Sequence, residues 1–440
     1  MNILKAVLKE EVEPACGCTE PIAVAYACSI AARAIGKNHH TAGQNFEISG
    51  IQIVLDPGVF KNGMGVCIPN TNGRKGIKIA AAMGVICGDP DLQLEVLKNV
   101  SQADMNAAEK MVQEDKVRVF CNPELCNLHI EATIQTSFGQ ARAVIERSHT
   151  NVTTVLVNGN PANALVSRQP SAEPQDSPSF CEMLSDMTIT DLVNLAEQMD
   201  EEDGEYIQQG IEMNVALAET GFGLGKFSSQ LHELWKQALV HDDIFSSTKI
   251  LVSGATDARM AGVNMPAMSS GGSGNQGIVA ILVPYNVGVK TGVESQKILQ
   301  SIALSHLLNV YIKQHTGKLA PICGCAIAAG AGAAAAIAHQ LTGSAEIVGW
   351  AVDNVLADIA GMLCDGAKGG CTLKVITSAD AAIRAAYFAA GGCHVTGSDG
   401  IIGRNPEETI KNLGRLCIEG MDHVDNTVLS IMTSKQRGDT

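Results

Sequence analysis

The sequence has few aromatic residues and few basic ones. Aromatic side chains make up 4% of the 440 residues and charged side chains 18%. Lysines and arginines total 31 against 46 aspartates and glutamates, which gives a formal net charge of -15. This negative charge repels the phosphates of nucleic acids and of anionic membranes, so we expect neither as a partner.

The chain also lacks segments that direct a protein out of the cytosol or into a membrane. Its first residues contain no apolar run with a small-residue cleavage site, so we expect a cytoplasmic protein. The longest uncharged stretch, residues 319–338, is dominated by alanine and glycine rather than by leucine, isoleucine and phenylalanine. This composition favours a buried helix over a transmembrane span.

The length exceeds what one hydrophobic core usually holds, so the sequence predicts several domains. Residues 44–160 predict an α+β sheet domain, because five stretches rich in branched residues occur at 46–56, 117–121, 128–136, 140–147 and 151–158. Residues 161–180 are rich in proline and polar residues and are typical of a linker. Residues 181–440 predict a mostly helical domain, and residues 1–43 predict helices that pack on it. The predicted fold class is α+β.

Fourteen cysteines are more than packing requires, and the cytosol would keep them reduced, which favours a metal or a catalytic thiol. Four segments combine a cysteine or a hydroxyl group with glycines that expose backbone amides. They are residues 16–21 (CGCTEP), 269–277 (SSGGSGNQG), 323–325 (CGC) and 364–371 (CDGAKGGC). Thiolates near free amides suit an iron-sulfur cluster, whose sulfur atoms accept hydrogen bonds from the backbone.

The spacing alone leaves other interpretations of the cysteines open. It matches neither the compact cysteine runs of ferredoxins nor the paired CxxC motifs of zinc ribbons. The alternatives are small core residues at glycine-rich helix ends, a zinc site and a redox dithiol. No histidine stands at ligand spacing from a cysteine pair, which weighs against zinc.

Residues 269–277 predict a loop whose amides and hydroxyl groups form an anion-binding nest. The segment lacks the ending of a phosphate-binding P-loop, so a carboxylate suits it better than a nucleotide. A flexible glycine hinge is the alternative interpretation. The candidate substrate-binding residues are Ser270, Gly272, Ser273, Gly274, Asn275 and Gln276.

The same segments carry a family resemblance. GCTEP at 17–21, GGSGNQGI at 271–278, ICGCAIAAGAGA at 322–333 and CDGAKGGCTLK at 364–374 resemble the L-cysteine desulfidase family, which is related to the iron-sulfur L-serine dehydratase α chain. The resemblance covers nearly the whole chain. It implies a lyase that converts L-cysteine into pyruvate, ammonia and hydrogen sulfide with a 4Fe-4S cluster and without pyridoxal phosphate.

The resemblance also implies roles for individual residues. Its cluster ligands would be Cys323, Cys364 and either Cys371 or Cys18, and three ligands would leave one iron open as a Lewis acid. The catalytic candidates are Cys18, Glu20 and Lys368, and the general base stays open among Glu20, Lys368 and His394.

Three further expectations concern the ligand pair, the partners and the activity. We predict that Cys323 and not Cys325 is a ligand, because side chains two positions apart in a helix beginning near Cys325 point in different directions. The expected partners are a small amino-acid substrate and further copies of the chain in a homo-oligomer. The alternative activities are an L-serine dehydratase of the same fold and a non-catalytic iron-sulfur or thiol redox sensor.

Overall fold

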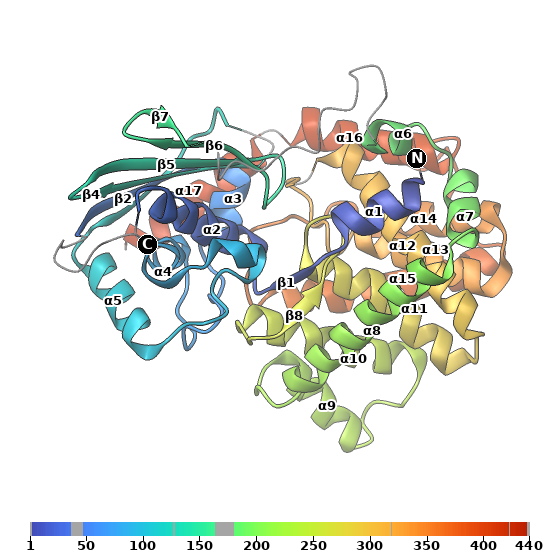
Figure 1. The fold of residues 1–440 in the computed structure, drawn as a ribbon. Helices are drawn as coiled ribbons and strands as arrows, with labels where there is room; N and C mark the ends of the chain where they lie inside the picture. Colours follow the sequence, from blue (N-terminus) through green and yellow to red (C-terminus); the bar gives the residue numbers. More distant parts are fainter. Residues whose placement is uncertain are drawn as a thin grey trace.

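In the computed structural model of the protein, the described residues are 2–36, 47–125, 128–162, 180–317, 319–421 and 423–437. They form a sheet part and a helical part, which confirms the α+β class (Figure 1). The predicted boundary near residue 43 and nearly all of the predicted linker lie outside the described residues.

The sheet part is built on six strands in the order β3-β2-β4-β5-β6-β7. β2 and β3 are parallel, and every other neighbouring pair in this sheet is antiparallel. The five strands expected from branched residues are present, and β7 is an addition. The strands are β2 (Ile48–Leu55), β3 (Val117–Cys121), β4 (His129–Thr136), β5 (Gly139–Glu146), β6 (Val152–Val157) and β7 (Asn160–Pro161).

Helix α2 (Thr19–Ala34) lies between the sheet and α4 (Ile77–Cys87), so it is apolar on nearly all sides. Of its 16 residues, 14 are buried. Gly84 lets α4 approach closely, because a Cβ atom there would lie 2.2 Å from the carbonyl oxygen of Ala25. The sheet part also contains α3 (Pro57–Gly63), a 3₁₀ helix (Pro90–Glu95) and α5 (Gln102–Gln113).

The expectation that residues 1–43 pack together on the helical part is wrong for α2. Only α1 (Ile3–Glu11) joins the core of the helical part, whereas α2 belongs to the core of the sheet part. The physical reason is that α2 is apolar on nearly all sides, and the sheet and α4 together bury its alanines and isoleucines.

The helical part surrounds α13, which is packed by α11, α12, α14 and α15. Its other helices are α1 together with α6 to α10 and α16. The bounds are α6 (Phe180–Ser185), α7 (Ile189–Glu197), α8 (Glu201–Gly221), α9 (Phe227–Lys236), α10 (Ile244–Met260), α11 (Gly274–Thr291), α12 (Ser295–Thr316), α13 (Ala328–Thr342), α14 (Ala345–Ile359), α15 (Cys371–Ala390) and α16 (Pro406–Arg415), which continues into a π-helical turn (Leu416–Gly420).

Small residues let the neighbours of α13 approach its backbone. A Cβ atom at Gly332 would lie 2.6 Å from the carbonyl oxygen of Ser305 in α12, and one at Gly330 would lie 2.6 Å from Ser378 Oγ in α15. The long uncharged stretch, residues 319–338, therefore consists of the turns that precede α13 and most of this buried helix. Within the described ranges, no helix is long and apolar enough to cross a membrane.

Both ends of the chain connect the two parts (Figure 1). Near the N-terminus, β1 (Pro14–Cys16) pairs antiparallel with β8 (Pro266–Met268), which joins the segment before Cys18 to the segment before α11. Near the C-terminus, α17 (Val424–Arg437) returns to contact α3, where buried Lys61 forms an ion pair with Asp425. These connections fix the seam at which the candidate site lies.

Candidate active site

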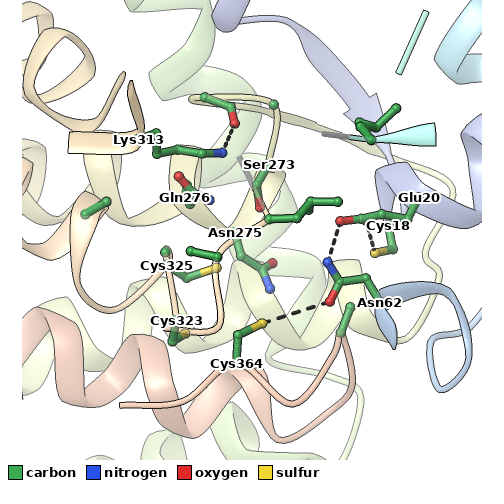
Figure 2. A pocket seen from close by; sticks show the side chains of 18 of the residues that line it. Cys18, Glu20, Asn62, Ser273, Asn275, Gln276, Lys313, Cys323, Cys325 and Cys364 are labelled. Carbon is green, nitrogen blue, oxygen red and sulfur yellow. Dashed lines mark hydrogen bonds between the residues drawn. The ribbon is translucent and has the colours of Figure 1, made fainter. Parts of the chain in front are cut away.

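Five cysteine side chains from three segments line one cavity at the seam between the two parts. They are Cys18, Cys323, Cys325, Cys364 and Cys371. Figure 2 shows Cys323, Cys325 and Cys364 on one side of this cavity and Cys18 with Glu20 on another. The sequence segments that were singled out for their cysteines therefore meet in space.

Cys323 and Cys364 are brought together by a short stretch of backbone pairing. The amide of Cys323 donates to the carbonyl oxygen of Met362 at 2.8 Å, and the amide of Cys364 donates to that of Pro321 at 2.7 Å. Between these two bonds, Ile322 and Leu363 form an antiparallel bridge. The two thiols thus enter the cavity from two backbone segments that lie side by side.

Cys371 is the first residue of α15 and closes the loop that begins at Cys364. Gly366 within this loop has φ of +90°, and a Cβ atom there would lie 2.5 Å from the carbonyl oxygen of Lys61, so the loop requires glycine. Cys371 belongs to the same small buried cluster as Cys18, with Val66 and Met260. Both candidates for the third ligand are therefore in the cavity wall.

The directional reason for preferring Cys323 over Cys325 is wrong, because α13 begins at Ala328 and not near Cys325. Residues 323–327 form turns, and both cysteines line the cavity. A hydrogen bond from Cys325, together with nearby Lys374, lowers the pKa of Cys323 to about 7 despite burial. The same contact and burial raise the pKa of Cys325. The choice of Cys323 as ligand stays a prediction.

Burial raises the pKa of Cys364 and raises that of Cys371 to about 11. Lys61 acts against this effect at Cys364, and Lys368 acts against it at Cys371. A metal deprotonates a thiol on binding, so the nearby lysines favour the thiolates that a metal requires.

A hydrogen-bonded chain links the two sides of the cavity (Figure 2). Cys18 Sγ donates to Glu20 Oε2 at 2.9 Å, Asn62 Nδ2 donates to Glu20 Oε1 at 2.8 Å, and Cys364 Sγ lies 3.9 Å from Asn62 Oδ1. Burial raises the pKa of Cys18, and the charge of Glu20 raises it further. Burial also acts to raise the pKa of Glu20, but His149 and the Cys18 thiol bring it below its ordinary value.

The glycine-serine segment contributes Gly272, Ser273, Asn275 and Gln276 to the cavity lining. Its end is not a loop as predicted, since α11 begins at Gly274 and Ser273 is its N-cap. The buried packing of α11 in the helical core overrides the weak helix propensity of its glycines. Asn275 and Gln276 therefore reach the cavity from the first turn of a helix.

Four other candidates lie away from the cavity lining. The hydroxyl group of Ser270 is bonded to His306 and Asn309, each at 2.9 Å. Lys368 Nζ donates to two carbonyl oxygens of its own loop and pairs with Asp365, so it stabilises that loop. His394 stacks on Trp350 with 4.0 Å between ring centroids. Gly274 is also outside the lining, but it provides space for a neighbouring side chain described below.

Sequence reasoning missed several charged and polar residues that line the cavity. These are Lys61, Asn62, His149, Arg259, Lys313 and Lys374. Most of them come from segments without a glycine-rich motif, and the helix that carries Arg259 was not anticipated. The only signal for Arg259 is its position beside Asp257 in an otherwise uncharged stretch, which indicates buried charges.

Residues 91–430 match the family model described as serine dehydratase alpha chain. The chain belongs to this family. Among similar relatives, a UPF0597 protein of Geobacter sulfurreducens is 46% identical over 99% of both chains. A UPF0597 protein of Elusimicrobium minutum is 42% identical over 99% of this chain and 100% of its own length. The family match includes Cys323, Cys364 and Cys371, whereas Cys18 lies before it.

The chemistry of the residues that line the cavity fits an iron-sulfur cluster. Among the residues that the structure describes, no three of histidine, cysteine, aspartate and glutamate are grouped to hold a single metal ion. A four-iron cluster binds its thiolates at different irons, so its ligands are spread more widely than those of one zinc ion. The cavity supplies several thiols with Lys61 and Lys374 beside them, and these cations offset the negative charge of thiolate ligands.

Proposed function

We propose that the protein is an iron-sulfur lyase that converts L-cysteine into pyruvate, ammonia and sulfide. The family match supports a lyase of the serine dehydratase type. The observation that carries the proposal is the meeting of Cys323, Cys364 and Cys371 in one cavity that also contains the Cys18–Glu20 pair.

Cys323, Cys364 and Cys371 are the proposed cluster ligands. Cys18 is the weaker candidate for the third position, because its thiol is hydrogen-bonded to Glu20 at 2.9 Å. A 4Fe-4S cluster held by three thiolates has one iron with a free coordination position, which can act as a Lewis acid on the substrate sulfur.

The Cys18–Glu20 pair is the proposed acid-base group. Glu20, which stays a carboxylate, takes the α-proton of the substrate, and Cys18 stays a thiol that donates a hydrogen bond to it. The electron pair of that C–H bond forms the Cα–Cβ double bond, and the Cβ–S bond breaks with its electron pair on sulfur, which leaves as hydrosulfide. The aminoacrylate takes up a proton to become an imine, and water hydrolyses the imine to pyruvate and ammonia.

Asn62 keeps Glu20 in place for this role, since it donates to the Glu20 oxygen that Cys18 does not use. Thr19 donates to the same Glu20 oxygen as Cys18, at 3.1 Å. Three donors hold the carboxylate in one orientation, which favours proton transfer from a fixed position. Lys368 is not proposed as the base, because it is bound within its own loop.

L-Cysteine is the preferred substrate in this proposal because soft sulfur binds iron more tightly than a hydroxyl oxygen does. An L-serine dehydratase is the second candidate, and the name of the matching family favours it. The test is an anaerobic assay of the iron-reconstituted protein with each amino acid. We expect equal amounts of pyruvate and sulfide from L-cysteine and a higher kcat/KM than for L-serine.

Two outcomes of that assay would contradict the proposal. A higher kcat/KM with L-serine would favour the dehydratase. A visible cluster spectrum without turnover of either amino acid would favour the redox sensor.

A further inference from the structure

Arg259, the next-to-last residue of α10, is a buried cation in the cavity wall. Its charge acts on the Glu20 carboxylate and lowers the pKa of that group, but the two form no ion-pair contact. The exposed fraction of Arg259 is 2%. Nη1 donates to Asn275 Oδ1 at 3.0 Å, whereas Nε has no hydrogen-bond partner among the residues that the structure describes. In the described part of the chain, no carboxylate lies within ion-pair distance of the guanidinium group. A buried guanidinium group with an unpaired Nε and no carboxylate in contact is unfavourable, so this position favours an anion bound beside it.

The structure leaves room for the guanidinium group at the N-terminus of α11. A Cβ atom at Gly274 would lie 2.3 Å from Arg259 Nε, so any larger residue there would displace the arginine. In the described residues, no side chain caps this 18-residue helix, whose first amides are therefore available to a ligand. The positive end of the helix dipole and the guanidinium charge act on the same place, and both favour an anion.

Gln276 lies between this positive site and the cysteines. Its side chain is 5% exposed, and Oε1 has no hydrogen-bond partner within the described ranges. The Gln276 amide group touches the turn that carries Cys323 and Cys325, because a Cβ atom at Gly324 would lie 2.7 Å from Gln276 Nε2. A buried carbonyl oxygen without a donor is a suitable acceptor for an ammonium group.

We infer that Arg259, oriented by Asn275, binds the carboxylate of a small α-amino acid and that Gln276 accepts a hydrogen bond from its ammonium group. This inference deepens the proposed function and rests on it for the identity of the ligand. The two contacts place the β-substituent toward Cys323 and Cys325, because Gln276 touches the turn that carries them. The arginine supplies the charge, and the α11 amides add hydrogen bonds to the same carboxylate.

The first test compares two probes on the iron-reconstituted wild-type protein by anaerobic calorimetry. L-Alanine has the α-ammonium and carboxylate groups but no leaving group, so its binding is separate from turnover. L-Alaninamide has the same shape and lacks the carboxylate charge. We expect L-alanine to bind on the order of 10- to 100-fold more tightly, as for a lost contact to a charged group. Equal binding, or no binding of either probe, would overturn the inference.

Three variants assign the selectivity to Arg259. Arg259→Lys keeps the charge but loses the forked geometry, and Arg259→Gln loses both, so the preference for L-alanine should fall in the first and vanish in the second. Arg415→Gln is the matched control, because it removes the same charge from the exposed end of α16. A preference that persists in a folded Arg259→Gln protein would overturn the assignment. Should that protein fail to fold, the probes on the wild type still decide.

The calorimetry separates the failure of this inference from the failure of the proposed function. If the protein selects L-alanine but releases no sulfide from L-cysteine, the amino-acid site is supported and the proposed activity is contradicted. If it releases sulfide and binds both probes alike, the proposed activity is supported and the role of Arg259 is contradicted.

Discussion

The cavity has two walls that differ in the origin of their residues. The thiol wall consists of Cys323, Cys325, Cys364 and Cys371, which follow or precede glycines in recognisable motifs. The polar wall consists of Cys18, Glu20, Asn62, Arg259, Asn275 and Gln276, of which Asn62 and Arg259 belong to no motif.

In the proposed function, the thiol wall binds the cluster and the polar wall binds the substrate. The thiol wall requires particular atoms at a few positions, and the short backbone pairing between residues 321–323 and 362–364 is enough to bring them together. The polar wall requires orientation, which depends on contacts between α2, α3, α10 and α11. Changes in the two walls should therefore have different consequences for iron and for turnover.

Loss of a thiol-wall ligand should have the largest effect. In Cys364→Ser, the hydroxyl group replaces a thiolate at the edge of the 364–371 loop, and we expect iron and activity to disappear together. Loss of an outer contact to a metal ligand already costs about 10- to 100-fold, so loss of the ligand itself should exceed about 100-fold. Iron and acid-labile sulfide, measured in anaerobic samples, check this expectation.

Three further cysteine variants provide the comparison for that result. Cys393→Ser changes an exposed thiol outside the cavity and should retain iron and activity. Cys323→Ser should lose iron and Cys325→Ser should retain it, and the reverse outcome would exchange the roles of these neighbours.

A polar-wall change should affect turnover and spare iron. In Glu20→Gln the side chain keeps its size but can no longer take the α-proton of the substrate. We expect kcat to fall by about 100-fold or more, as for loss of a general acid-base group. Turnover rates measured per bound iron separate a loss of catalysis from a loss of the cluster. A parallel loss of iron would mean that Glu20 helps to hold the cluster.

Asn275→Ala should have a smaller effect on the same wall. The variant removes the oxygen that orients Arg259 through a 3.0 Å bond, but it leaves the guanidinium charge in place. We expect kcat/KM to fall by about 1.5 to 3 kcal/mol, which corresponds to roughly 10- to 150-fold, at constant cluster content. Unchanged activity per cluster would reduce the glycine-serine segment to a hinge.

A carboxyl group outside both walls should change stability alone. Burial raises the pKa of Asp353 in α14 from its ordinary 3.8 to about 6. The unfolded chain then releases this proton more readily than the folded chain, so stability falls as the pH rises from about 4 to about 6. Asp353→Asn should be more stable than the wild type at pH 7, by at most about 3 kcal/mol.

The Asp353 prediction is checked by urea unfolding at two pH values. The stability difference between variant and wild type should be present at pH 7 and shrink toward pH 4. A difference that is independent of pH would remove titration as its cause, and a change in kcat would connect Asp353 to the site.

The sequence predicts much of this molecule where the pattern is local. Branched residues identified β2 to β6 because alternation along a strand reflects burial of one sheet face. The cysteine motifs indicated the thiol wall because each carries its chemistry within a few residues.

The parts that sequence reasoning missed depend on contacts across the fold. The packing of α2 depends on the sheet and α4, which bury it from two sides, and α11 is helical because the core buries it. Arg259 is recognisable only when Asn275 and Gly274 are seen beside it. A buried cation in one helix and a glycine in another become one site only in three dimensions.

The central claim is that the cavity eliminates sulfide from L-cysteine at a cluster bound by the thiol wall. The most direct measurement is a reconstitution series in which anaerobic protein samples with increasing iron content are assayed for pyruvate and sulfide from L-cysteine. The account predicts that both products form in equal amounts and that their rate rises in proportion to bound cluster. Pyruvate formation by iron-free protein, or a cluster-loaded protein that releases no sulfide, would contradict it.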